Sequence, residues 1–289
     1  MQPILGLLAP SARRVSVILP VKNGRQHIGQ ALRSIVQNVC ADDELIVIDD
    51  ASTDGTAFLV DEVLRRLQPS FSVRMIAGLG KGPAVARNQG LRLAKGEFIA
   101  FLDHDDHWPD NRVAAHVAVL QSARDVAVVM GKTQYVDESV DESTKGVLAR
   151  ATGLGDAAGL LNVGDAVQGQ VGSRGLASQP SRPPGFLPDP HYHVHLGAST
   201  FVRTVFESVG VFDEELRFSE DHDLFLRIRE MNLRIHPVEA TGLYYRIHQT
   251  NMTRSKQLQE MQLFTVIQKS LRRRREQGAI LSPFPQNVV

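Results

Sequence analysis

Phe98-Ile99-Ala100-Phe101-Leu102-Asp103-His104-Asp105-Asp106 is the stretch that decides the fold of this chain. A short apolar run that ends in polar residues predicts a strand buried on both faces, as in a parallel sheet. Its carboxyl end brings three carboxylates to the edge where open α/β sheets bind ligands. Such close carboxylates repel one another unless a cation lies among them, which predicts Mg²⁺ or Mn²⁺ holding a diphosphate. The alternative is that they cap the helix that opens near Trp108, a role suited to Asp106.

Length and composition indicate an ordinary globular protein. The chain has 289 residues, of which 43% are hydrophobic, enough for one large α/β domain. Its formal net charge is zero, so no overall field attracts nucleic acid or an anionic membrane. The one cysteine, Cys40, excludes an internal disulfide and fits a reducing compartment. The apolar run 4–9 is too short to span a bilayer, and its basic residues follow it, so we expect no signal peptide.

Strand and helix patterns alternate along the first half of the chain. β-branched or apolar runs predict strands at 15–20, 45–48, 71–77, 98–102 and 126–130. Helical spacing of apolar residues predicts a helix after each of the first three strands and another from about Asn111. This alternation predicts parallel βαβ units with right-handed crossovers. The expected fold class is α/β, with a mostly parallel central sheet flanked by helices.

The second half of the chain has weaker patterns. Glycine and proline are frequent from 146 to 197, which predicts either a flexible functional segment or a merely tolerated insertion. Apolar spacing then predicts a helix just after Glu220 and Asp221, and a last helix at 257–275 that ends in four arginines. That arginine run could be a solvated helix end, or it could contact anionic lipid or a phosphorylated acceptor.

Side chains suited to a nucleotide follow the predicted strands. Asp50 could accept a hydrogen bond from a base or ribose, and Arg87 could offer a phosphate its planar fork of donors. Asp103 and Asp105 suit a metal ion. Taken singly, Asp50 could be a turn residue and Arg87 a solvated helix charge. Their order at one sheet edge predicts a nucleotide-diphosphate site.

Several histidines have more than one interpretation. His191, His193 and His195 alternate, so a strand would place them on one face. They could bind zinc, contact an acceptor, or belong to an ordinary polar surface. His248 could likewise be a structural histidine or contact the diphosphate or its metal.

Motifs in both halves of the chain together resemble the family 2 glycosyltransferases with the GT-A fold. The resemblance covers about residues 15–135 and 195–255. It implies a Rossmann-like nucleotide-diphospho-sugar transferase fold and inverting sugar transfer from a nucleotide-diphosphate donor. The motifs that carry it are Pro20-Val21-Lys22-Asn23, Ile48-Asp49-Asp50-Ala51-Ser52-Thr53-Asp54-Gly55-Thr56, Ala86-Arg87-Asn88-Gln89-Gly90, Phe101-Leu102-Asp103-His104-Asp105-Asp106, Phe212-Asp213-Glu214, Glu220-Asp221-His222-Asp223-Leu224, Tyr245-Arg246-Ile247-His248 and Asn251-Met252-Thr253.

The resemblance also implies a role for each residue at a matching position. Asp221 would be the general base, and Asp105, with Asp103 and His248, would hold Mg²⁺ or Mn²⁺. We expect acceptor contacts from Glu220 and His195. The donor would contact Pro20, Val21, Asn23, Asp50, Arg87, Asp103 and His104.

Two departures from the family pattern bear on the substrate. Lys22 stands where many members carry a tyrosine beside the base. Lysine has no aromatic ring, so the resemblance does not imply that this residue stacks on uracil. The sequence shows neither the acceptor motif of the processive synthases nor membrane spans. We therefore expect one sugar to pass from a UDP-sugar to a discrete saccharide, lipid-linked or peptide acceptor.

Two other functions fit parts of the pattern. A sugar-phosphate nucleotidylyltransferase has a similar sheet, but it usually carries a glycine-rich basic loop where this chain has Asn23-Gly24-Arg25. A non-catalytic nucleotide-sugar-binding protein would keep Asp50 and Arg87 but would not need Asp221 beside a metal site. An enzyme is the better interpretation.

The expected organisation has four parts. An N-terminal extension at 1–14 precedes a nucleotide-sugar-binding half at 15–135. An acceptor-binding and catalytic half at 136–255 includes the flexible segment, and 256–289 forms a helical basic tail. We expect a cytoplasmic protein without a nucleic-acid partner, whose tail could contact the inner membrane face weakly.

Overall fold

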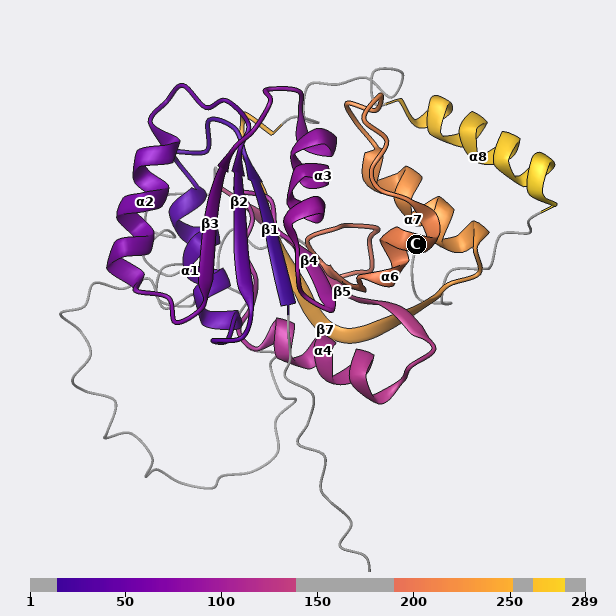
Figure 1. The fold of residues 1–289 in the computed structure, drawn as a ribbon, viewed down its shortest axis with the longest axis horizontal. Coiled ribbons are helices and arrows are strands. Elements are labelled where there is room, and N and C mark those ends of the chain that lie inside the picture. Colours follow the sequence, from indigo (N-terminus) through magenta and orange to yellow (C-terminus); the bar gives the residue numbers. More distant parts are fainter. Residues whose placement is uncertain (1–14, 139–189, 252–261, 279–289) are drawn as a thin grey trace, which may run out of the picture.

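The computed structural model describes residues 15–138, 190–251 and 262–278. In these ranges the chain forms one seven-stranded sheet in the order β3-β2-β1-β4-β6-β5-β7, with helices on both faces (Figure 1). The predicted extension at 1–14, the predicted flexible segment up to 189 and the end of the tail from 279 lie outside the described residues.

The first half alternates strands and helices as predicted. Its strands are β1 (Val15–Val21), β2 (Glu44–Asp49), β3 (Ser72–Ala77) and β4 (Phe98–Phe101). Its connecting helices are α1 (Ile28–Asn38), α2 (Thr56–Leu67) and α3 (Pro83–Leu93). All four strands are parallel, so their carboxyl ends meet at one edge of the sheet.

The second half completes the same sheet. β6 (Ser199–Val202) runs antiparallel between β4 and β5 (Val126–Asp137), and β7 (Arg234–Ile247) pairs parallel with β5. The other helices in the described ranges are α4 (Arg112–Ser122), α6 (Thr204–Val209), α7 (Glu220–Glu230) and α8 (Leu263–Gln277). The domain boundary expected at 135 therefore falls inside β5, within one continuous sheet.

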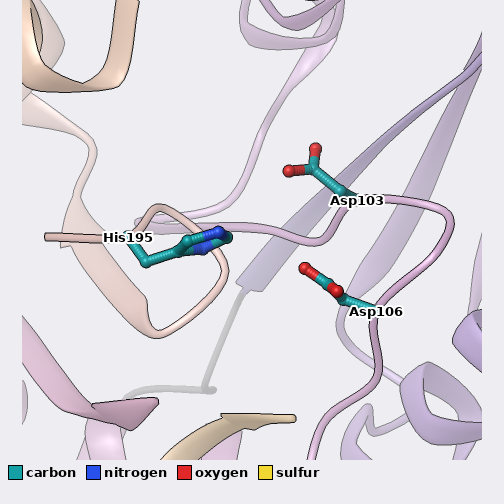
Figure 2. Close-up of side chains that lie close together, drawn as sticks. All are labelled: Asp103, Asp106 and His195. Atoms are coloured by element: carbon teal, nitrogen blue, oxygen red, sulfur yellow. The ribbon is translucent and has the colours of Figure 1, made fainter. Parts of the chain in front are cut away.

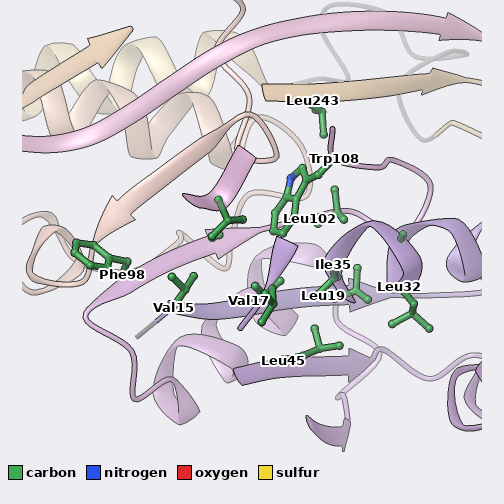
Figure 3. Close-up of a cluster of buried hydrophobic side chains, with 14 of the residues drawn as sticks. Val15, Val17, Leu19, Leu32, Ile35, Leu45, Phe98, Leu102, Trp108 and Leu243 are labelled. Atoms are coloured by element: carbon green, nitrogen blue, oxygen red, sulfur yellow. The ribbon is translucent and has the colours of Figure 1, made fainter. Parts of the chain in front are cut away.

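Alternating side chains of the strands give the sheet a hydrophobic core on each face. Val17 and Leu19 of β1 belong to the core with α1, α2 and α4 (Figure 3). Ile18, between them in sequence, belongs to the core with α3, α6 and α7. Burial of the strands on both faces explains their nearly continuous apolar sequence.

Two glycines allow β5 and β7 to pass very close to each other. A Cβ on Gly131 would lie 2.6 Å from the Cα of Gly242, where the pairing of the two strands changes register. Only a residue without a side chain fits such an approach. The end of β7 then reaches the turn after β4, because His107 and Tyr244 exchange backbone hydrogen bonds of 3.2 and 3.0 Å.

Candidate active site

A pocket of about 1250 Å³ lies at the carboxyl ends of β1, β2 and β4. Open parallel sheets bind their ligands at this edge. The twelve site residues predicted from the sequence all line this pocket: Pro20, Val21, Asn23, Asp50, Arg87, Asp103, His104, Asp105, His195, Glu220, Asp221 and His248. The sheet thus brings together residues that lie far apart in the sequence.

Asp50 fixes the loop that leads into α3. Its buried carboxylate accepts the backbone N–H of Gly80 at 2.7 Å on Oδ1 and that of Gly82 at 2.8 Å on Oδ2. Gly82 has a φ of 101°, which favours glycine. An ionised carboxylate offers about four acceptor positions, so these two bonds leave capacity for a base or ribose. The predicted base contact of Asp50 stays a prediction.

The loop after β1 is held by its neighbours. Asn23 accepts the N–H of Thr53 at 2.8 Å and donates its own N–H to the Ser52 hydroxyl at 2.9 Å. The next residue, Gly24, packs so close to the ring of His104 that a Cβ there would clash with it. The loop is therefore pinned between the turn after β2 and the turn after β4.

Arg87 joins two sides of the pocket. Its side chain is 5% exposed, its Nη2 donates to Oδ1 of Asp103 at 2.6 Å, and its Nη1 pairs with Glu220. Burial alone would lower the pKa of Arg87, but the carboxylates of Asp103 and Glu220 raise it above its usual range. Arg87 is thus a permanent cation between the turn after β4 and the start of α7. The predicted phosphate contact of Arg87 stays a prediction, because both terminal nitrogens already bind carboxylates.

The turn after β4 forms a group that suits a metal ion. Asp103, Asp106 and His195 each offer one ligand atom, and these atoms lie within 4.8 Å of one another (Figure 2). Burial raises the pKa of Asp106, and the charges of Asp105 and Asp103 raise it further. A divalent cation with oxygen ligands would relieve this repulsion, so the residues present fit Mg²⁺ or Mn²⁺.

Asp105 lies in a neighbouring pair with His248. His248 Nε2 is 3.1 Å from Oδ2 of Asp105, and its Nδ1 is 2.8 Å from the Thr250 hydroxyl. Burial would raise the pKa of Asp105, but the hydrogen bond from His248 and the charge of His104 bring it down to about 2. The predicted metal set of Asp103, Asp105 and His248 is therefore spread over two adjoining groups.

Asp106 does not cap a helix, so the capping alternative for it is wrong. Its Oδ1 accepts the backbone N–H of Arg246 at 2.9 Å, whereas α4 begins only at Arg112, after Asn111. Arg246 also donates from Nε to the carbonyl oxygen of Asp105 at 2.9 Å. These bonds attach the end of β7 to the acidic turn, which explains why Asp106 is buried.

Two residues of this region were not predicted from the sequence. His27, just before α1, lines the pocket, and its ring lies against that of His248 with the centroids 4.6 Å apart. Burial, with the charge of Arg246 next, lowers the pKa of His27 to about 4. No motif marks His27, whereas Arg246 stands inside the motif Tyr245-Arg246-Ile247-His248 and could have been found there.

Asp221 lies in the first turn of α7, with its side chain 23% exposed. Its Oδ1 accepts the backbone N–H of His222 at 2.7 Å and lies 2.9 Å from His222 Nδ1. Burial would raise the pKa of Asp221, but these bonds to His222 hold it well below its usual range. The N-cap position of α7 belongs to Ser219, so Asp221 is not the capping residue. It is an ionised carboxylate on the pocket wall.

The three alternating histidines do not share one role. Only His195 among them lines the pocket. The N–H of Gly197 donates to its Nδ1 at 3.1 Å, so the neutral ring carries its proton on Nε2. His191 pairs with Thr133 of β5 and stacks on Tyr135, with ring centroids 5.5 Å apart. Within the described residues, the three histidines form no cluster with the spacing of metal ligands.

Comparison with known families identifies the class of protein. The family described as Glycosyl transferase family 2 matches residues 16–174, more than half of the chain. The chain therefore belongs to the family 2 glycosyltransferases, as the sequence motifs predicted. Every helix among the described residues is too short or too polar to span a bilayer.

Two curated proteins from Escherichia coli match the chain over part of its length. WfgD, a UDP-Glc:alpha-D-GlcNAc-diphosphoundecaprenol beta-1,3-glucosyltransferase, is 36% identical over 110 residues, which are 37% of this chain and 40% of WfgD. WfaP, with the same described activity, is 30% identical over 110 residues, which are 38% of this chain and 42% of WfaP. The chain thus spans about two fifths of the length of these relatives.

Solved structures confirm the predicted fold. S. aureus TarS in complex with UDP-GlcNAc superposes with a TM-score of 0.60 at 18% identity, over 89% of this chain and 65% of that one. The mannosyltransferase PcManGT from Pyrobaculum calidifontis, in complex with GDP-Man and Mn²⁺, superposes with a TM-score of 0.52 at 20% identity. The match covers 79% of this chain and 56% of PcManGT. At these identities the likeness shows the fold, and this fold is GT-A.

Proposed function

We propose that this protein transfers a single sugar from a UDP-sugar to an acceptor hydroxyl, with inversion and with the help of Mg²⁺ or Mn²⁺. The observation that carries the proposal is the double pairing of Arg87. Its guanidinium binds Asp103 in the acidic turn and Glu220, the residue before Asp221. The predicted diphosphate position and the predicted base therefore share one pocket.

The names of similar proteins support a UDP-sugar as donor. WfgD and WfaP are named for UDP-Glc, and TarS was solved with UDP-GlcNAc. PcManGT was solved with GDP-Man, so the fold also accepts another nucleotide. In this chain the residues that would meet the nucleoside are Asp50 and Asn23, on two loops at the carboxyl ends of β1 and β2.

The acidic turn supports a divalent metal as cofactor. Asp103, Asp105 and Asp106 would hold it, with His248 beside them. When bound, the ion would neutralise charge on the departing diphosphate as a Lewis acid. Mn²⁺ is present in the solved structures of PcManGT and of GalNAc-T7, which fits this assignment.

Asp221 supplies the base of the proposed reaction. The acceptor oxygen forms a bond to the anomeric carbon while its proton passes to the Asp221 carboxylate. The bond from that carbon to the diphosphate oxygen breaks, and the nucleoside diphosphate leaves with the electron pair. His222 keeps Asp221 ionised and oriented through two contacts. Attack from the face opposite the diphosphate inverts the anomeric carbon. General-base assistance is worth about 10²–10⁴ in rate.

The proposed acceptor is a hydroxyl of a saccharide, a lipid-linked sugar or a peptide. The names of WfgD and WfaP include a diphosphoundecaprenol acceptor, which supports the lipid-linked class. Of the two predicted acceptor residues, His195 suits the role better, because Glu220 is buried and already paired with Arg87. A cytoplasmic location, with the tail at the inner membrane face, is part of the same proposal.

Two measurements with the purified chain test the proposed function. Thermal unfolding with a panel of nucleotide sugars and Mn²⁺ should show a higher midpoint with one UDP-sugar than with its ADP and GDP counterparts. A ligand at about 100 times its dissociation constant adds about 2.7 kcal/mol to stability. The second measurement is the release of UDP as the chain slowly hydrolyses that donor. An enzyme should release UDP, whereas a non-catalytic sugar-binding protein should not. If no nucleotide sugar stabilised the chain, the proposal would be wrong.

A further inference from the structure

Helix α8 lies at the periphery of the molecule beside α7 (Figure 1), and its two faces differ. Val266 and Ser270, on the inner face, are only 1% and 3% exposed. Phe264, Ile267 and Leu271 are 66%, 50% and 39% exposed. Their spacing of three and four residues places these three on one side of the helix. The outer face of α8 is therefore an apolar stripe in contact with solvent.

The arginine run at the end of α8 is divided between the two faces. Arg273 belongs inside: it donates to Asp223 at 3.0 Å and to Glu230 at 2.6 Å, and both carboxylates are buried. Arg272 and Arg275 are exposed and form no ion pair with any residue that the structure describes. The run is thus neither wholly solvated nor wholly available to a ligand.

Helix α2 carries two exposed arginines whose charge is balanced within the helix. Arg65 pairs with Asp61 and Arg66 pairs with Glu62, each one turn earlier in the helix. The exposed arginines of α8 have no acidic residue in that position. Arg272, Arg275 and Glu276 are all exposed at this end of α8, so its outer side carries a net positive charge next to the apolar stripe. Such a combination complements an anionic surface.

The apolar stripe begins beside the wall of the pocket. Gln262, at the start of α8, accepts the backbone N–H of Arg217 at 2.8 Å and of Phe218 at 3.2 Å on its side-chain oxygen. Arg217 and Phe218 both line the pocket, shortly before Asp221. The exposed Phe264 follows Gln262 by two residues. Whatever covers the outer face of α8 is thereby brought close to the base side of the pocket.

We propose that the outer face of α8 docks on an anionic membrane surface and so presents the base side of the pocket to a lipid-linked acceptor. Interfacial helices bury large apolar side chains in the headgroup region and direct basic residues to lipid phosphates. The apolar side chains on the outer face of α8 are Phe264, Ile267 and Leu271. The exposed basic residues are Arg272 and Arg275. The unpaired arginines favour a membrane over a second copy of this chain. The statement about the acceptor rests on the proposed function, whereas the docking itself does not.

Vesicle sedimentation with the full chain tests the docking. The wild type should bind vesicles of equal phosphatidylcholine and phosphatidylglycerol and should not bind phosphatidylcholine alone. Joint replacement Phe264→Ser, Ile267→Ser and Leu271→Ser should weaken binding about tenfold or more. Each of Arg272→Gln and Arg275→Gln should weaken it about fivefold, in a salt-dependent manner. The matched control is Phe58→Ser on α2, a side chain 67% exposed, which should bind like the wild type.

Two outcomes would overturn the docking proposal. One is that the wild type does not bind phosphatidylglycerol vesicles, or that the triple variant binds them equally well. The other is that neither the wild type nor the triple variant binds vesicles, while the wild type is a dimer in solution and the triple variant is a monomer. That result would assign the outer face of α8 to a second copy of the chain. Titration of UDP with Mn²⁺ in the absence of vesicles should be unchanged in the triple variant. That titration separates a failure of docking from a failure of the proposed sugar transfer.

Discussion

Nη2 of Arg87 lies 2.6 Å from Oδ1 of Asp103, in an ion pair that links α3 to the turn after β4. The other terminal nitrogen of Arg87 binds Glu220 at the start of α7. A single buried cation thus holds the acidic turn against the helix that carries Asp221. The relative positions of the proposed metal site and the proposed base depend on this side chain.

Replacement of Arg87 should therefore be costly to stability. Arg87→Met would leave Asp103 and Glu220 facing each other without a cation, and loss of one partner from a buried ion pair costs about 3–5 kcal/mol. Arg87→Lys keeps the charge but not the fork of donors, so it should cost less. Urea unfolding measures both. Equal stability of Arg87→Met and the wild type would show that the two carboxylates do not need the guanidinium.

Asp221→Asn should separate catalysis from folding. Asn can still accept the backbone N–H of His222, so the chain should fold, with a moderately lower unfolding midpoint because the contact between the carboxylate and the His222 ring is weakened. It cannot take a proton, so the rate of sugar transfer, or of donor hydrolysis where the acceptor is unknown, should fall by about 10²–10⁴. UDP affinity should stay near that of the wild type. Asp61→Asn, on the exposed surface of α2, is the control and should retain full activity. Wild-type turnover by Asp221→Asn would remove this residue from the role of base.

His116 should make the protein less stable in mild acid. Burial, with the charge of Arg112 next, lowers the pKa of His116 well below its usual value near 6.5, while its Nδ1 lies 3.1 Å from the Thr200 hydroxyl. The unfolded chain therefore takes up a proton first as the pH falls. Neutral His116 therefore costs no stability above pH 6.5. Below pH 6.5 the free energy of unfolding falls by up to about 1.4 kcal/mol per pH unit.

Urea unfolding at two pH values on either side of 6.5 checks this expectation. His116→Asn can keep a polar contact with Thr200 but does not titrate, so it should lose about 1 kcal/mol less than the wild type between pH 7 and pH 5.5. Other buried histidines, such as His107, would account for the slope that remains. An identical loss in both proteins would mean that His116 does not contribute to the acid sensitivity.

The sequence was sufficient to predict the edge of the sheet that carries the site. Asp50 and Asp103 each follow a short apolar strand, and parallel βαβ topology forces the ends of such strands to one edge. Both residues line the pocket, as expected. Local pattern and chain topology therefore determine this part of the site without knowledge of distant contacts.

Contacts between distant segments could not be predicted in the same way. The carboxylate of Asp106 could have bound a nearby helix or, as it does, the N–H of Arg246 on β7. The long strand β7 itself has an irregular register with β5, so no simple alternation marks it. Arg273 likewise resembles its neighbours in the arginine run, and only the packing of α8 on α7 singles it out. Periodicity shows which face is buried but not which partner covers it.

Calorimetric titration of UDP, with Mn²⁺ or with EDTA, tests the central proposal most directly. The wild type should bind UDP at least about tenfold more tightly with Mn²⁺, because a diphosphate beside Asp103, Asp105 and Asp106 is otherwise repelled. Asp105→Asn keeps the size of the side chain and should lose most of this gain. Its unfolding midpoint should fall, because the ionised Asp105 stabilises the fold through His248, so the titration is done well below that midpoint. Equal metal-free affinity in both proteins, or no binding of UDP under any condition, would contradict a metal-assisted nucleotide-sugar site in this pocket.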